Sequence, residues 1–195
     1  MFVSDNLNVN EKGHLTIGGI DTVDLAKEYG TPLYVMDEQV VRKNLRRFHE
    51  SMQKYYGGRG EVHYASKAFS CLEMCRIVAS EGDGLDAVSI GELYTAVKAG
   101  FPMDKVGFHG NNKTNDELEY ALDCGVGHII VDNISELHRL EKIAAEKGVK
   151  ANIMFRIKPG IDAHTHDFVK TGRSEEHTSE LQSLEDLVCR LLLEK

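Results

Sequence analysis

The stretch VHYASKAF, residues 62–69, places a single lysine, Lys67, at the end of a run that otherwise favours a buried β-strand. An amine at such a position would lose its hydration without an obvious ion-pair partner. Burial lowers the pKa of a lysine and makes the neutral, nucleophilic amine accessible near neutral pH. We therefore predict that Lys67 is desolvated and can condense with an aldehyde to form an imine.

Polar residues also end the four predicted strands that follow. These residues are Asp86 and Ser89 in 84–89, His109 and Asn111 at the end of 105–110, Asp132 and Asn133 in 128–133, and Arg156 in 151–157. If the strands are parallel, all of these side chains surround one rim of the sheet. With Lys67 they would bring an amine, two carboxylates, an imidazole and a guanidinium to a single site.

Each of these strand-end residues also has an ordinary structural explanation. Asp132 and Asn133 could cap the helix that follows them. Arg156 could pair with a structural carboxylate, and His109 could be a packed histidine with one hydrogen bond. Lys67 is the hardest to explain in this way, because burying an unpaired lysine is costly.

Turn signals and hydrophobic periods predict the elements that must position these residues. The alternating stretch LNVNEKGHLTIGGI, residues 7–20, predicts a β-hairpin. A short helix follows, with Asp21 or Thr22 as its cap and Gly30 at its end, and then a strand at 32–37.

From residue 38 onward, predicted helices and strands alternate, beginning with a helix at 38–56. Each later helix closes on a glycine, the residue that best adopts the left-handed conformation of a helix end. Strands with little polar alternation, joined by helices, indicate a parallel sheet covered by helices. The candidates are a (β/α)₈ barrel and a doubly wound sheet, and a rim of polar strand ends is typical of barrel enzymes.

Composition excludes several classes of protein. The chain has 195 residues, is 42% hydrophobic and 28% charged, and carries a net charge of -8. A soluble globular protein has this composition, and its negative field would repel nucleic acids and anionic membranes. Because no apolar run approaches the length of a membrane span and the N-terminus lacks a signal-peptide pattern, we expect a cytoplasmic enzyme.

The cysteines and two histidines could suggest a metal site. The four cysteines, Cys71, Cys75, Cys124 and Cys189, form no CxxC pair and no zinc-site spacing. We expect reduced, structural thiols. His164 and His166 form an H-x-H pair that could place both rings on one side of a strand.

Several separated motifs, in the same order, resemble a known family. They are YASKA, GLDAVSIGEL, GFHGNNKT, VDN and FRIKPGIDAHTHDFVKTG, with the lead-in YGTPLYVMDE. Together they resemble the N-terminal part of the diaminopimelate decarboxylase family, pyridoxal-phosphate enzymes with an alanine racemase-like barrel. The resemblance covers residues 4–172, and in this family the segment with His164 and His166 needs no metal.

The resemblance implies a decarboxylase that converts meso-2,6-diaminopimelate to L-lysine, with pyridoxal 5'-phosphate as cofactor and a homodimer as the assembly. Lys67 would be the catalytic residue that holds the cofactor as an imine. Asp86 would lie near this lysine, and His109 and Arg156 would line the cofactor pocket.

The same resemblance divides the chain into three parts. Residues 1–31 would be a β segment that joins a C-terminal β-domain absent from the chain. Residues 32–172 would form an incomplete (β/α)₈ TIM-like barrel with five of its eight strands. The string RSEEHTSELQS, residues 173–183, resembles a translated sequencing adapter, so residues 173–195 are interpreted as a non-native tail. We expect such a fragment to be inactive and poorly soluble on its own.

Other readings stay open at this point. A decarboxylase of the same fold could act on carboxynorspermidine, arginine or ornithine. A non-catalytic pyridoxal-phosphate protein would share the barrel, although the N-terminal hairpin argues against it. A metal-binding or scaffold protein without cofactor is the third alternative.

Overall fold

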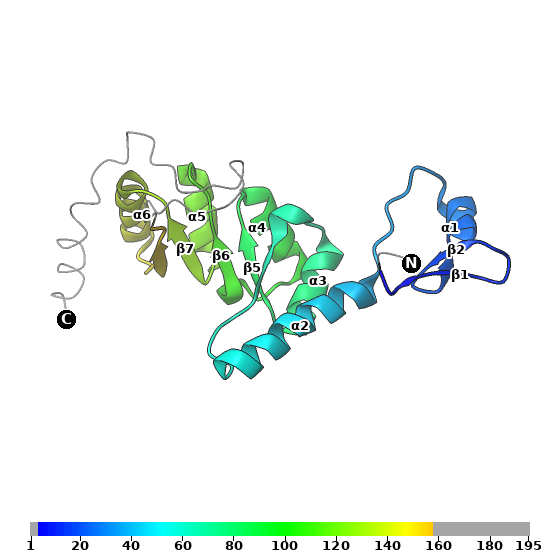
Figure 1. Ribbon diagram of the computed structural model, residues 1–195. Helices are drawn as coiled ribbons and strands as arrows, with labels where there is room; N and C mark the ends of the chain where they lie inside the picture. The colour runs from blue at the N-terminus through cyan, green and yellow to red at the C-terminus, as the bar shows by residue number, and fades with distance from the viewer. Residues whose placement is uncertain (1–3, 158–195) are drawn as a thin grey trace, which may run out of the picture. The chain divides into compact units, whose positions relative to one another are not determined.

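The computed structural model describes residues 4–157, and its contacts divide the chain into two units, Met1–Phe155 and Arg156–Lys195. Every helix and strand described below belongs to the first unit (Figure 1). His164, His166 and the tail 173–195 lie outside the described residues.

The N-terminal segment forms a small antiparallel sheet and one helix. Its elements are β1 (Leu7–Val9), β2 (Leu15–Ile17), β3 (Ile20–Asp21) and α1 (Thr22–Tyr29), with strand order β1-β2-β3. The predicted hairpin is confirmed and carries a third short strand. Asp21 caps α1 by accepting a hydrogen bond from the Val23 amide at 2.8 Å, which stabilises the first turn of the helix.

The predicted strand at 32–37 is wrong. These residues have no regular secondary structure, although their sequence is a short apolar run like that of a strand. A strand needs a neighbour for its backbone groups, and within the described residues 32–37 pair with none. Leu33 and Tyr34 are accordingly exposed. The helix α2 (Glu38–Tyr56) then begins at Asp37, whose side chain accepts from the amides of Gln39 and Val40.

Five parallel strands form the second sheet. They are β4 (His63–Ala65), β5 (Gly84–Ala87), β6 (Val106–Phe108), β7 (His128–Val131) and β8 (Ile153–Phe155), in sequential order. Each pairs in parallel with the next. Sequential order with a helix between neighbours is the arrangement of a barrel wall, so the predicted partial (β/α)₈ barrel is confirmed.

The connecting helices follow the expected pattern. They are α3 (Leu72–Glu81), α4 (Ile90–Ala99), α5 (Asn115–Cys124) and α6 (Ile134–Lys147). Each ends at a glycine with a left-handed backbone, as the sequence predicts. The start of α5 is a complete capping box, in which Thr114 and Glu117 bond each other's backbone amides.

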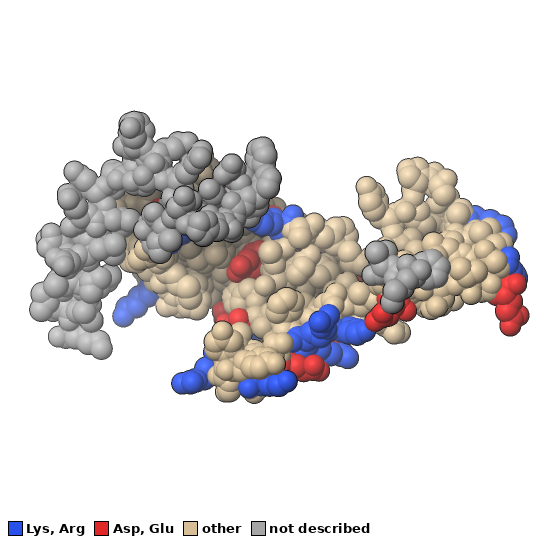
Figure 2. Space-filling view, viewed as in Figure 1, with Lys and Arg blue, Asp and Glu red and all other residues tan. Residues whose placement is uncertain are grey.

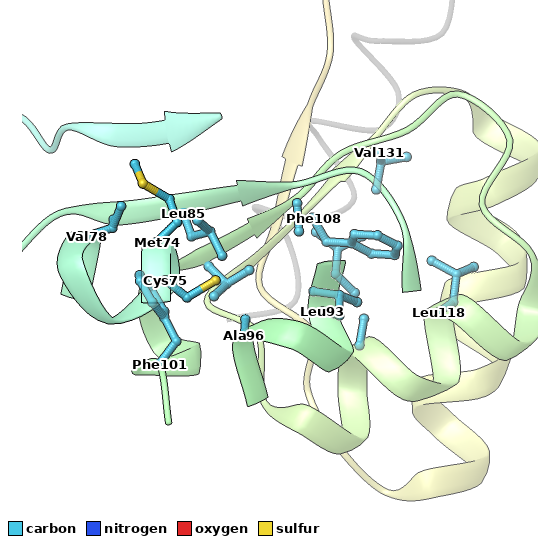
Figure 3. Close-up of a cluster of buried hydrophobic side chains, with 14 of the residues drawn as sticks. Met74, Cys75, Val78, Leu85, Leu93, Ala96, Phe101, Phe108, Leu118 and Val131 are labelled. Atoms are coloured by element: carbon cyan, nitrogen blue, oxygen red, sulfur yellow. The ribbon is translucent and has the colours of Figure 1, made fainter. Parts of the chain in front are cut away.

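The two faces of the parallel sheet differ because successive side chains of a strand point to opposite sides. One set is fully buried against the helices, and Figure 3 shows Leu85, Phe108 and Val131 gathered with helix residues such as Leu93 and Leu118. The intervening positions, including Asp86 and His109, lie on the opposite face. That face corresponds to the interior of a closed barrel.

Two arginines of α2 pair with one glutamate at the end of α3. Arg42 Nη1 lies 2.7 Å from Glu81 Oε1, and Arg46 Nε lies 2.7 Å from Glu81 Oε2. Figure 2 shows basic and acidic side chains side by side over this helix. This pairing fastens α2 to the end of α3.

Candidate functional site at the carboxyl ends of the parallel strands

The polar face of the sheet brings together three side chains from three neighbouring strands. Asp86 of β5 lies between His63 of β4 and His109, the residue after β6. His63 Nδ1 is 3.0 Å and His109 Nε2 is 3.4 Å from the same oxygen, Asp86 Oδ1. The predicted proximity of Asp86 and His109 is therefore confirmed by the structure.

The two imidazoles determine the charge of this carboxylate. Burial alone would raise the pKa of Asp86, but the hydrogen bonds from His109 and His63 outweigh burial and hold its pKa far below the ordinary value. The bond to Asp86 in turn raises the pKa of His63. The site thus carries a fixed negative charge flanked by two imidazole rings.

Sequence reasoning missed His63. It stands in β4, whose partner in the register is β5: His63 faces Gly84 and Ala65 faces Asp86. Once the register of β4 and β5 is known, His63 is seen to point to the same face of the sheet as Asp86, and this would have identified it. The register itself depends on pairing between strands about 20 residues apart, which no local pattern contains.

Lys67 does not lie on the strand itself. It follows β4 in a 3₁₀ turn, Ser66–Ala68, at the carboxyl end of the sheet. Its side chain is exposed and has no hydrogen bond or ion pair with any of residues 4–157. The prediction of a desolvated Lys67 is therefore wrong for this chain, because the five parallel strands of residues 4–157 form a wall and not a closed barrel. Asp86 was expected to lie near this lysine, and its contacts in the structure are with His63 and His109.

The residue before Lys67 anchors the turn. Ser66 is 1% exposed, and its Oγ lies 2.7 Å from the Asp86 carbonyl oxygen and 2.5 Å from Glu92 Oε2. The same Glu92 oxygen accepts from the Val88 amide at 2.8 Å. One buried hydroxyl therefore connects the ends of β4 and β5 to α4, and this connection fixes the backbone from which Lys67 projects.

Replacing Ser66 by alanine is expected to destabilise the protein by about 1–3 kcal/mol, because it removes a buried hydroxyl donor that lies within bonding distance of the Asp86 carbonyl oxygen and of Glu92 Oε2. The matched control is Ser51→Ala, since the exposed Ser51 hydroxyl bonds only the Arg47 carbonyl of its own helix. Urea unfolding of both variants measures the difference. Equal losses at the two serines would contradict the anchoring role of Ser66.

Ser89 and Asn133 are helix caps that accept from the amides of Glu92 and Glu136. The helix-cap explanation given above for Asn133 is therefore confirmed. The Asp132 side chain takes part in a polar or electrostatic interaction, so it is not an unpaired carboxylate. Arg156 begins the second unit of the chain, and its part in the site stays a prediction.

A buried ion pair supports the loop that follows His109. Lys113 Nζ lies 2.8 Å from Glu136 Oε1 and donates to the carbonyls of Gly110 and Ile130 at 2.7 and 2.8 Å. Both side chains are almost completely buried. The ammonium group therefore serves the fold, fastening the loop after β6 to the end of β7, and is not available to a ligand.

The donor set fits an aldehyde-bearing cofactor better than a metal ion. Within residues 4–157 no group of three or more His, Cys, Asp or Glu side chains is arranged to hold a metal. The exposed amine of Lys67 can condense with an aldehyde, and the strand ends beside it present a carboxylate and imidazoles. No described helix is long and apolar enough to cross a membrane.

This parallel barrel wall, with an accessible lysine and polar side chains at its carboxyl end, defines a cofactor-binding domain of the (β/α)₈ class. Residues 40–187 match the family described as pyridoxal-dependent decarboxylase, pyridoxal binding domain, and the chain belongs to that family. The match extends past Gly172 into the segment that we interpreted as a tail.

The relatives place the chain close to one branch of this family. It is 51% identical over 175 residues to a diaminopimelate decarboxylase of Bacillus methanolicus and 50% identical over 167 residues to one of Methanothermobacter thermautotrophicus. These alignments cover 90% and 86% of this chain but only 40% and 38% of the relatives. The chain thus spans about two fifths of the length of these curated relatives.

A solved structure shows the same architecture. Diaminopimelate decarboxylase from M. jannaschii, in complex with L-lysine, matches with a TM-score of 0.84 at 33% identity. The match covers 100% of this chain and 46% of that chain. A lysine/ornithine decarboxylase of Vibrio vulnificus, at 20% identity and a TM-score of 0.63, shares the fold.

Proposed function

We propose that the full-length protein carrying this chain is a pyridoxal-phosphate-dependent carboxy-lyase that converts meso-2,6-diaminopimelate to L-lysine and CO₂. The observation that carries this proposal is the accessible Lys67 amine at the carboxyl rim of the barrel wall. The chain is about 50% identical in sequence to diaminopimelate decarboxylases. This identity supports diaminopimelate as the substrate, rather than another basic amino acid.

Lys67 is the residue that would hold the cofactor covalently. Its Nζ must be unprotonated to attack the aldehyde carbon, and its position on an exposed turn gives it access. When bound, pyridoxal phosphate supplies the electron sink for the pair left by the departing carboxylate. Ser66 keeps the turn in place, because its hydroxyl ties the turn to β5 and α4.

Asp86 and His109 would act beside the cofactor without reacting covalently. The Asp86 carboxylate stays ionised between two imidazoles and provides a fixed negative charge at the rim. A fixed negative charge favours a nearby cationic nitrogen, such as a protonated amine of the substrate or of Lys67. Arg156 is proposed as a further residue of the cofactor pocket, and no metal is required.

The proposal also concerns the parts beyond the described structure. Residues 1–31 would belong to a β-domain completed by a later part of the full-length chain, and residues 32–172 to the barrel. This chain spans about two fifths of the length of its relatives, so a full-length protein of that length has room for the rest of the barrel and for the β-domain. We propose a homodimer as the working assembly, and an inactive fragment where the later part is lacking.

The test is a substrate comparison on the full-length protein supplied with pyridoxal phosphate. Release of CO₂ is measured with meso-diaminopimelate, L-ornithine, L-arginine and carboxynorspermidine. We expect kcat/KM to be highest for diaminopimelate by at least about 100-fold, because a site that bonds a polar substrate group rejects analogues lacking it. A preference for any other substrate would overturn the assignment, and cofactor binding without turnover would indicate a non-catalytic protein.

A further inference from the structure

We propose that His63 is a positioning residue, which lies over Gly84 and holds the Asp86 carboxylate in place at the rim of the sheet, opposite His109. The inference concerns contacts within the chain, so it does not depend on the proposed substrate. No sequence motif identifies His63 as a residue of the site, because it lies in β4, an ordinary strand that precedes the lysine turn.

Two glycines make this arrangement possible. His63 faces Gly84 in the register, and a Cβ at position 84 would lie 2.5 Å from ring atoms Cδ2 and Nε2 of His63. Asp86 faces Gly107 in the same way, and a Cβ there would lie 3.1 Å from Asp86 Oδ1. Each polar side chain therefore leans over a glycine of the next strand, and this lean brings His63 within reach of Asp86.

Both ring nitrogens of His63 face carboxylates. Nδ1 is 3.0 Å from Asp86 Oδ1 and Nε2 is 3.4 Å from Glu61 Oε2. On the other side of Asp86, His109 Nε2 is 3.4 Å from the same oxygen. An imidazole with an acceptor at each nitrogen can donate to both only as the cation, so His63 links the two carboxylates as a charged bridge.

The pH dependence of this bridge follows from the directions of the two pKa changes. Asp86 has a lowered pKa, so its contribution to stability is present above about pH 3.8 and is lost as the pH falls through its folded value. His63 has a raised pKa, so its contribution is complete below about pH 6.5 and is lost as the pH rises through its folded value. The contribution of the bridge to stability is therefore complete between about pH 3.8 and pH 6.5.

The experiment follows the Asp86 carboxyl by ¹³C NMR during a pH titration of the full-length protein, with Asp86→Asn assigning the signal. His63→Phe removes the donor. Gly84→Ala keeps both titrating groups and displaces the ring by contact with the new methyl group. In each variant we expect the titration of Asp86 to move upward by about one unit or more, a tenfold change in its acid constant.

A conservative variant and a control variant test whether the change in the Asp86 titration is specific to His63. His63→Gln keeps an N–H donor and is expected to restore part of the low titration. His128→Phe changes a histidine of the same face, in β7, and should leave Asp86 unaffected, because His128 has no bond to it. An unchanged Asp86 titration in folded Gly84→Ala, or an equal shift in His128→Phe, would overturn the proposal. If His63→Phe does not fold, Gly84→Ala and His63→Gln decide the matter.

Discussion

Replacing Lys67 by alanine is expected to reduce kcat/KM of the full-length protein for diaminopimelate by at least about 1,000-fold, because the reaction loses its covalent nucleophile. The turn Ser66–Ala68 offers no second amine. Lys67→Arg should be equally inactive, since a guanidinium keeps the positive charge but stays protonated and does not condense with an aldehyde. Decarboxylation assays under saturating cofactor measure both variants.

The control for this prediction is a lysine of similar exposure on a nearby element. Lys98 lies in the last turn of α4, where its Nζ approaches the Tyr94 ring at 5.3 Å. Lys98→Ala should retain activity within a few-fold of the parent. If Lys67→Ala kept more than about a tenth of the activity, Lys67 could not be the covalent nucleophile.

Replacing Lys113 by alanine is expected to cost about 3–5 kcal/mol of unfolding free energy, because it leaves the buried Glu136 carboxylate without its cation. The two side chains are 2% and 0% exposed, so solvent cannot compensate for the loss. Removal of the ammonium group also deprives the carbonyls of Gly110 and Ile130 of a donor. Because Gly110 directly follows His109, the loop that carries this imidazole should loosen as well.

A double replacement tests the physical reason. Lys113→Met with Glu136→Leu removes both charges while roughly keeping volume, and should recover a large part of the loss. The exposed pair of Lys142 and Glu146, 3.9 Å apart on α6, is the control. Lys142→Ala should change stability by less than about 1 kcal/mol. Urea unfolding at one pH compares all the variants, and a loss at Lys113 no larger than at Lys142 would contradict the buried-pair account.

Local signals in the sequence predicted most of the described fold. Helix ends were predicted from glycines such as Gly100 and Gly148, because only a residue without a side chain readily takes their left-handed backbone. The strands were predicted because buried parallel strands are short apolar runs. The strand predicted at 32–37 is absent, because a short apolar run forms a strand only where a neighbouring strand provides hydrogen bonds.

The candidate site was predicted less completely, for reasons of distance along the chain. Asp86 and His109 were found because parallel strands bring their carboxyl ends to one rim. His63 was missed because its contact with Asp86 depends on register and on the space over Gly84. The burial of Lys67 was predicted wrongly because burial depends on strands that close the barrel, and the described sheet has five.

The central claim is that Lys67 is the amine that binds the cofactor. The most direct test is to incubate the full-length protein with pyridoxal phosphate, reduce the covalent link with borohydride and map the pyridoxyl group by peptide mass spectrometry. The label is expected on the peptide that contains Lys67. A label on another lysine, or on none, would contradict it.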